Sequence, residues 1–120
     1  MINQKQYTKG LQGEKAAEDF LLSCGMSCLE RRYRREGGEI DLIMQDGETV
    51  VFVEVKSRPS GRTGDGLIAV TPAKRKRIIK AATVYLMERE DFTLPVRFDV
   101  VEITADGVKH VANAFQADGW

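Results

Sequence analysis

The sequence has few of the residues that hold disulfide-rich or zinc-binding domains together. It contains two cysteines, Cys24 and Cys28, and one histidine, His110, to which we assign no role. A single CxxxC pair without a second Cys or His cluster does not complete a zinc site, and two cysteines do not make a disulfide framework. We therefore expect reduced thiols, as in cytoplasmic proteins, with both cysteines as small core-filling residues.

Long apolar runs are also missing. No stretch approaches the ~20 apolar residues that a membrane-spanning helix needs, and the first ten residues, MINQKQYTKG, lack the apolar segment of a secretory signal. We expect a cytoplasmic protein with no membrane partner. The chain has 120 residues, of which 42% are hydrophobic, and this suits one domain, residues 1–120, around one core.

An excess of either charge is absent, since the net charge is zero. The charges are unevenly distributed, however: residues 1–80 carry 15 Lys and Arg against 11 Asp and Glu, and residues 81–120 carry 3 against 7. Basic residues are concentrated at 31–35 (RRYRR) and 74–77 (KRKR). Such a field can steer a polyanion to one face of a neutral molecule, although two solvated charge runs would give the same pattern.

Hydrophobic periodicity predicts the element order α-β-β-β-α-β. Residues 13–24 have the apolar period of a helix that Gly25 ends, and a second helix is expected to start at Thr71-Pro72 and run to about residue 90. Strands are expected at 26–35, 39–45, 49–58, 96–104 and, as a short edge strand, 108–115. The Gly- and Pro-rich segment 57–70 is expected to be a mobile loop. The class is therefore α/β, a mixed sheet flanked by helices.

Two charged residues, Glu54 and Lys56, lie inside the most apolar predicted strand. They are two positions apart and share a face, and their burial is costly unless they pair or bind a metal. An Asp46-Gly47 hairpin turn would place Asp41 opposite Phe52 and diagonal to Glu54, ~7–8 Å away. Two carboxylates at that separation can share Mg²⁺, for which Mn²⁺ can substitute, and the backbone carbonyl of Val55 can add an oxygen.

An Asp-Glu-Lys group with Mg²⁺ favours hydrolysis of a phosphodiester. The cation would stabilise charge on a phosphate oxygen, while Lys56 would orient or deprotonate the attacking water or neutralise the transition state. Glu14 is a candidate fourth group, although a Glu in the first turn of a helix is also common because it interacts well with the helix dipole. A structural Glu54–Lys56 ion pair, with Asp41 as a turn residue, is the alternative that needs no ligand.

Further basic residues are candidates for binding nucleic acid. Lys74 falls on the buried side of the second predicted helix near its N-terminus, where it can face the site and attract phosphate. The other predicted contacts to nucleic acid are Arg31, Arg32, Arg34, Arg35 and Arg77. Tyr33 either stacks on an unpaired base or is a half-buried strand residue. Asp99 lies in a buried strand, and we expect it to pair with a basic residue rather than to bind metal.

Five segments in order, GEKAAEDFL, GEIDLI, VFVEVK, TPAKRKRIIKAATVYL and RFDVV, resemble the YraN-like family of small bacterial proteins. GEIDLI followed by VFVEVK also resembles the D-x(n)-E-x-K signature of the PD-(D/E)XK nuclease superfamily, with Ile40 in place of proline before the aspartate. This resemblance implies a restriction-endonuclease-like core, as in Holliday-junction resolvases, and a Mg²⁺-dependent DNA endonuclease. It implies Asp41 and Glu54 as metal ligands, Lys56 as the catalytic lysine and Glu14 as a resolvase-like helix acid. Branched or structured DNA and a homodimer are expected by the same analogy.

Two other functions fit the same residues. One is a non-catalytic nucleic-acid-binding protein with this fold, and the other is a structural or regulatory partner domain whose Asp-Glu-Lys group is an ion-paired core feature. DNA cleavage that a chelator abolishes would separate the nuclease from both. A steep salt dependence of DNA binding would separate the second function from the third.

Overall fold

The computed structural model describes residues 4–58 and 70–117 and confirms the predicted order of elements. The elements are α1 (Gln4–Ser23), β1 (Ser27–Arg35), β2 (Gly38–Asp46), β3 (Thr49–Arg58), α3 (Pro72–Arg89), β4 (Val96–Thr104) and β5 (Gly107–Phe115). Helix α1 begins at Gln4 rather than at residue 13, because Gln and Lys favour helix without an apolar period. Most of the loop predicted at 57–70 lies outside the described residues.

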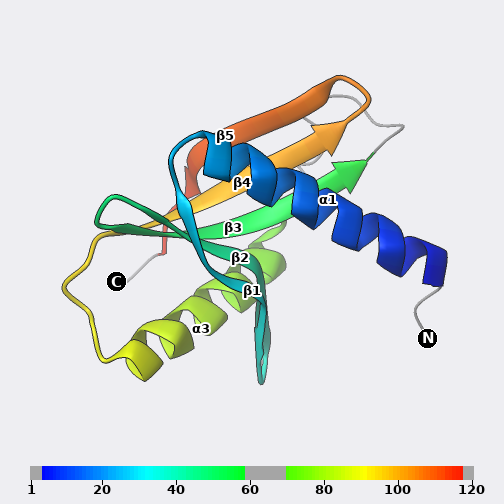
Figure 1. Ribbon diagram of the computed structural model, residues 1–120. Coiled ribbons are helices and arrows are strands. Elements are labelled where there is room, and N and C mark those ends of the chain that lie inside the picture. Colours follow the sequence, from blue (N-terminus) through cyan, green and yellow to red (C-terminus); the bar gives the residue numbers. More distant parts are fainter. Residues whose placement is uncertain (1–3, 59–69, 118–120) are drawn as a thin grey trace.

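The five strands form one mixed sheet in the order β1-β2-β3-β4-β5. Strands β3 and β4 are parallel, and the other neighbouring strands are antiparallel. Helices α1 and α3 cover opposite faces of this sheet (Figure 1). This arrangement is the α/β core with a mixed sheet that the sequence predicted and is consistent with a restriction-endonuclease-like fold. None of the helices within the described ranges is long and apolar enough to cross a membrane.

Strand β3 lies at the centre of the sheet and contributes to the core on both faces. Val50 and Phe52 pack in the cluster on the α3 side, whereas Val51 and Val53 pack in the cluster on the α1 side. All four side chains are buried, which is why this strand has a nearly continuous apolar sequence. The same alternation places Glu54 and Lys56 on the face that α3 covers.

Apart from the earlier start of α1, the two helices follow the sequence prediction except at Cys24. Thr71 caps α3, since its hydroxyl accepts the N–H of Lys74 at 3.2 Å, and Pro72 follows at the start of the helix. The predicted buried stripe of α3 is confirmed at Ile78, Ala81, Ala82 and Tyr85. The core position predicted for Cys24 is wrong: Cys24 is exposed, because α1 ends at Ser23 and the cysteine lies in the following turn.

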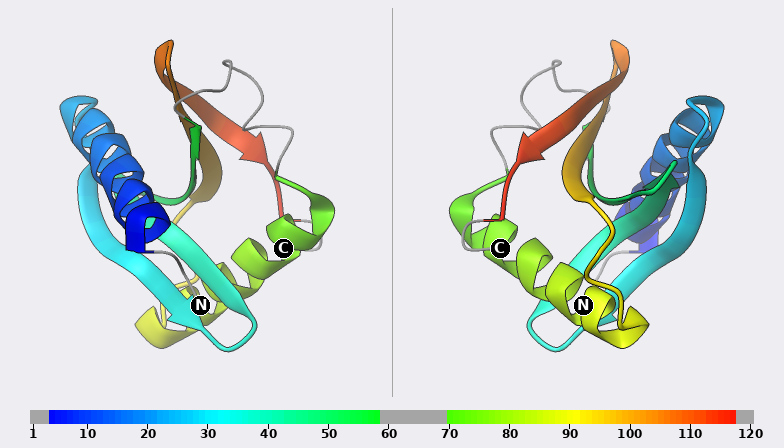
Figure 2. Two further views of the ribbon diagram at one scale, coloured as in Figure 1. Left: turned by 90° about the vertical axis from the view of Figure 1, so that its right-hand side faces the viewer. Right: turned by 90° about the vertical axis from the view of Figure 1, so that its left-hand side faces the viewer.

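The sheet divides at one end between β2 and β3. The two strands pair from Asp46↔Thr49 as far as Leu42↔Val53. Beyond that point β2 continues beside β1 to Gly38, and β3 continues beside β4 to Arg58. The β1–β2 hairpin turns away from β3 and passes beside α3 (Figure 2). We call the point of separation, at Asp41 and Glu54, the strand fork.

Candidate active site

The turn between β2 and β3 differs from the predicted one and changes the alignment of the acidic residues. Gly47 and Glu48 form the turn, because Asp46 still pairs with Thr49. Gly47 has a φ of +61°, which glycine adopts readily at the first position of a two-residue turn. The residue aligned with Asp41 is therefore Glu54 rather than Phe52. A shift by two positions preserves the face of the strand, so the predicted approach of the two carboxylates survives the change in register.

Asp41 is held at the strand fork by a backbone contact. Its Oδ2 accepts the N–H of Val55 at 2.7 Å. This contact lies just beyond Leu42↔Val53, where the pairing of β2 with β3 ends. This hydrogen bond fixes one carboxylate oxygen against β3. Val55, whose carbonyl was the predicted backbone ligand, thus lies directly beside Asp41.

Glu54 is the most deeply buried acidic residue of the strand fork, with 4% of its surface exposed. Its Oε1 lies 3.4 Å from the Nζ of Lys56 and 3.5 Å from the Nζ of Lys74. The predicted common face of Glu54 and Lys56 is confirmed, as is the orientation of Lys74 toward them. Lys74 also lies 3.5 Å from Glu39. The sequence reasoning missed Glu39, although it stands two residues before Asp41 on the same strand.

Helix α1 brings Glu14 to the same place. A Cβ on Gly13 would lie 2.7 Å from the Cβ of Ser57, so the glycine allows α1 to approach β3 closely. The Glu14 carboxyl group lies close enough to that of Asp41 for Asp41 to raise its pKa. Its Oε2 also accepts a hydrogen bond from Nε of Arg32 at 2.7 Å. Glu14 therefore links the helix to the strand fork.

The pKa values of all three carboxyl groups are raised, chiefly by burial. Burial and then the neighbouring Asp41 raise the pKa of Glu54 to about 7, against the opposing effect of Lys74 and Lys56. Burial also raises the pKa of Asp41, although the N–H of Val55 and the charge of Lys74 oppose it. The pKa of Glu14 is raised by burial and by Asp41, against Arg32. Each group would be stabilised in its ionised form by an additional cation.

A cavity of about 380 Å³ opens at the strand fork. We call it the fork cavity; its walls are Gly10, Glu14, Asp41, Glu54, Val55, Lys56, Ser57 and Arg58. A second cavity of about 260 Å³ lies between α1 and β1 and also touches Glu14 and Asp41. A third, of about 420 Å³, is lined by Thr83 and four apolar residues near the end of α3 and has no charged wall. The fork cavity therefore combines the predicted acidic residues with Lys56.

The donor set of the fork cavity suits a hard divalent cation. Its carboxylates offer oxygen only, and oxygen is what Mg²⁺ and Mn²⁺ prefer. Within residues 4–58 and 70–117, no three His, Cys, Asp or Glu side chains form a ready-made metal cage. Mg²⁺ does not require one, because it binds through one or two carboxylates and keeps several waters. Asp41 and Glu54, with their raised pKa values, fit that mode of binding.

Each arginine of the 31–35 run forms an ion pair. The pairs are Arg31–Glu18, Arg32–Glu14, Arg34–Glu39 and Arg35–Glu88. The side chains of Arg31, Arg34 and Arg35 are 65%, 62% and 44% exposed. That of Arg32 is only 26% exposed, and it turns toward the strand fork. Arg77, the other predicted contact to nucleic acid, is exposed on α3.

Tyr33 and Asp99 have structural partners. The Tyr33 ring is buried edge-to-face against Tyr85, at 5.4 Å between centroids, and its hydroxyl donates to Glu88. Of the two alternatives for Tyr33, the structure thus favours the strand residue. Asp99 is fully buried and accepts two hydrogen bonds from Arg97, at 2.9 and 3.0 Å. It also contacts the His110 ring at 2.6 Å. The predicted pairing of Asp99 with a basic residue is confirmed.

Comparison with known proteins identifies relatives along most of the chain. Residues 13–103 match the model of the family described as "Uncharacterised protein family UPF0102". A UPF0102 protein of Saccharophagus degradans is 45% identical over 112 residues, which cover 92% of this chain and 95% of the relative. One of Geobacter metallireducens is 42% identical over 111 residues, covering 89% and 91%. One of Clostridioides difficile is 40% identical over 116 residues, covering 95% and 100%. In agreement with its resemblance to the YraN-like proteins, the chain belongs to the UPF0102 family.

Proposed function

We propose that this protein is a metal-dependent endonuclease that hydrolyses phosphodiester bonds in DNA. One observation carries the proposal. Asp41, Glu54 and Lys56 converge on the fork cavity with Glu14 beside them, and burial raises the pKa of all three carboxyl groups. Perturbed carboxyl groups gathered in a cavity are typical of catalytic sites.

The ligands proposed for Mg²⁺ or Mn²⁺ are the carboxylates of Asp41 and Glu54 and the carbonyl of Val55. Glu14 supplies a further carboxylate oxygen from α1. When bound, the divalent cation supplies positive charge to the scissile phosphate and lowers the pKa of an attacking water. Asp41 is already oriented for this task, since the N–H of Val55 at 2.7 Å restricts its rotation.

The two lysines beside Glu54 act on the phosphate and the water. Lys56 lies 3.4 Å from Glu54 and lines the fork cavity, from which it can orient or deprotonate the attacking water or neutralise the transition state. Lysine suits this work better than arginine, because its pKa shifts readily and its charge is compact. Lys74, in the first turn of α3, approaches the same oxygen of Glu54 as Lys56 does and can bind a phosphate oxygen.

Branched or structured DNA is the proposed substrate, and a homodimer would place two such sites on opposed strands. Outside the cavity, Arg34 and Arg35 offer exposed guanidinium groups. Their ion pairs with glutamates are solvent-exposed, and exposed pairs of this kind contribute about 0–1 kcal/mol. A DNA phosphate can therefore replace the glutamate at little cost. Arg31 and Arg77 are the remaining proposed contacts to the DNA backbone.

The proposal is tested by single-turnover cleavage of branched, nicked and linear DNA with saturating enzyme and Mg²⁺ or Mn²⁺. Lys56→Ala should lower the cleavage rate by ~100-fold or more, while cation and DNA affinity stay within a few-fold of wild type, because Lys56 acts mainly in the transition state. Lys109→Ala is the matched control. Lys109 is an exposed strand lysine of β5 outside the fork cavity, so its loss should leave the rate unchanged.

Three outcomes contradict the proposal in different ways. Equal rates for wild type and Lys56→Ala would mean that the active site is assigned wrongly. Binding of DNA without cleavage of any substrate would favour the non-catalytic nucleic-acid-binding protein. Failure to bind DNA at low salt would favour the structural or regulatory domain, in which Glu54 and its lysines are an ion-paired core feature.

A further inference from the structure

Arg32 differs from the other arginines of its run in backbone as well as in exposure. Its φ of +49° lies in the left-handed region, which non-glycine residues seldom adopt. It stands between the Arg31↔Leu42 and Tyr33↔Ile40 pairs of β1 and β2, so it lies beside Asp41 at the strand fork. An ordinary strand alternation therefore does not set the direction of this side chain.

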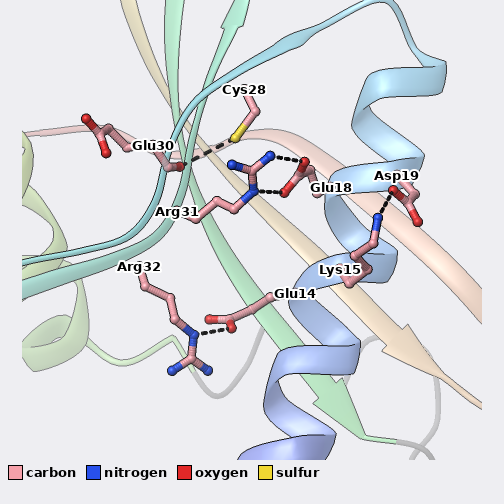
Figure 3. Close-up of polar contacts among 8 residues, drawn as sticks. All are labelled: Glu14, Lys15, Glu18, Asp19, Cys28, Glu30, Arg31 and Arg32. Carbon is pink, nitrogen blue, oxygen red and sulfur yellow. Dashed lines mark hydrogen bonds and ion pairs between the residues drawn. The ribbon is translucent and has the colours of Figure 1, made fainter.

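Arg32 forms an ion pair with Glu14 of α1. Figure 3 shows Arg32 directed at Glu14, and Arg31 directed at Glu18 one helical turn further along α1. The Arg32 Nε lies 2.7 Å from Oε2 of Glu14. Both side chains are largely buried, at 26% and 15% exposure. A charge-assisted hydrogen bond in such surroundings is strong and directional.

The position of the Glu14 carboxyl group beside Asp41 is electrostatically unfavourable unless a positive charge compensates it. This carboxyl group faces that of Asp41, and two ionised carboxylates in contact repel each other. Without a positive partner, the Glu14 side chain would be expected to turn away from the strand fork. Arg32 of β1 supplies that partner through its Nε, which donates to Oε2 of Glu14.

We propose that Arg32 is a positioning residue of the fork cavity: it holds the Glu14 carboxylate beside Asp41 so that α1 contributes an oxygen to the cation site. The inference rests on the proposed metal-dependent function. It separates Arg32 from Arg31, Arg34 and Arg35, whose exposed side chains remain available to a DNA backbone. Arg32 is then an internal residue of the site rather than a contact to nucleic acid.

Simple electrostatics and positioning predict opposite signs when Arg32 is replaced. Removing a positive charge near a cation site strengthens cation binding by relieving repulsion. Removing a residue that orients a ligand weakens it, typically by 10- to 100-fold for outer partners of metal ligands. The direction of the change in cation affinity therefore distinguishes a positioning residue from a bystander charge.

The test is calorimetric titration of Mn²⁺ into wild type, Arg32→Gln, Arg32→Lys and Arg31→Gln. We expect both Arg32 variants to bind Mn²⁺ about 10-fold more weakly or worse. Arg32→Lys keeps the charge and loses the Nε donor, so it separates geometry from charge and also serves if Arg32→Gln does not fold. Arg31→Gln is the matched control, because Arg31 bonds α1 through two hydrogen bonds to Glu18 at 2.6 and 2.7 Å. Its Mn²⁺ affinity should stay within about 2-fold of wild type if the site depends on Arg32 rather than on general docking of the helix.

A double-mutant cycle with Glu14→Gln shows whether Arg32 acts through Glu14. If it does, Arg32→Gln should weaken Mn²⁺ binding no further once Glu14 is already Gln. Affinity in the Arg32 variants equal to or tighter than wild type would overturn the inference, and so would additive losses in the cycle. Those results leave the proposed nuclease intact. Wild-type protein that binds no Mn²⁺ would instead overturn the metal-dependent function, and the role of Arg32 with it.

Discussion

Glu54 serves the proposed site at a cost to the stability of the folded protein, and replacing it with glutamine measures that cost. In the metal-free state, burial and Asp41 hold the pKa of Glu54 near 7, against an ordinary value of 4.5. The folded protein therefore binds the Glu54 proton more tightly than the unfolded chain. The contribution of Glu54 to the free energy of unfolding is therefore most favourable below pH 4.5 and falls as the pH rises through 7. Glu54→Gln removes this loss while keeping an oxygen that can accept from Lys56 or Lys74.

The expected gain follows from the size of the pKa shift. A shift from 4.5 to about 7 corresponds to about 3 kcal/mol in the free energy of unfolding at pH 8. At pH 5 the same shift leaves less than about 1 kcal/mol, because the wild-type carboxyl group is then mostly protonated in the folded state. Urea unfolding in EDTA should show a midpoint raised by about 2 M at pH 8 and by much less at pH 5.

Glu18→Gln is the matched control with the opposite sign. Glu18 is also buried in the folded protein, but the hydrogen bonds from Arg31 lower its pKa. Its ionised form therefore adds stability above pH 4.5 that is lost as the pH falls, and the variant should be less stable at pH 8. A Glu54→Gln protein that is less stable than wild type, or whose gain does not depend on pH, would refute the reasoning. Glu54 would then be a stabilising ion-pair partner of its lysines.

Two further predictions concern the hairpin of β1 and β2. Gly38→Ala should lower the free energy of unfolding by about 1–3 kcal/mol, because the new Cβ would lie 2.4 Å from the backbone oxygen of Arg77; urea unfolding measures the loss. Gly10→Ala, whose Cβ meets nothing closer than 3.8 Å, should show no loss, and equal behaviour of the two variants would contradict the packing argument. Replacing Arg34 and Arg35 with Gln should reduce the slope of log K against log salt in duplex DNA binding by about 0.9 for each DNA phosphate that the variant no longer neutralises. An unchanged slope would mean that these arginines are only a solvated face.

Local patterns in the sequence were sufficient for the elements of the fold. Periods of two and 3.6 residues predicted the strands and the sheet-covering parts of both helices, since these periods are set by the backbone geometry of each element. The capping of α3 by Thr71 was predicted in the same way. The start of α1 was missed, because residues 4–12 form helix without an apolar period.

Part of the candidate site could also be predicted from the spacing of residues along one strand. Glu54 and Lys56 share a face because they are two residues apart on one strand, and their approach to 3.4 Å follows from that spacing. Asp41 was placed on the correct face with the wrong partner, because the turn type sets the register and Gly47 rather than Asp46 begins the turn. The resemblance to known nucleases assigned roles to these residues, and those roles remain a proposal.

The rest of the site was decided by the tertiary structure. In the sequence, Arg31, Arg32, Arg34 and Arg35 form one basic run. In the structure, Arg32 is the least exposed of the four and is directed at Glu14, because its backbone is left-handed and α1 packs across β1. The orientation of Lys74 toward the site was predicted from its place on the helix, but its additional ion pair with Glu39, which joins α3 to a second strand, was not. Charge pairing and desolvation depend on which groups meet across distant segments, so they appear only when helices and sheet are packed together.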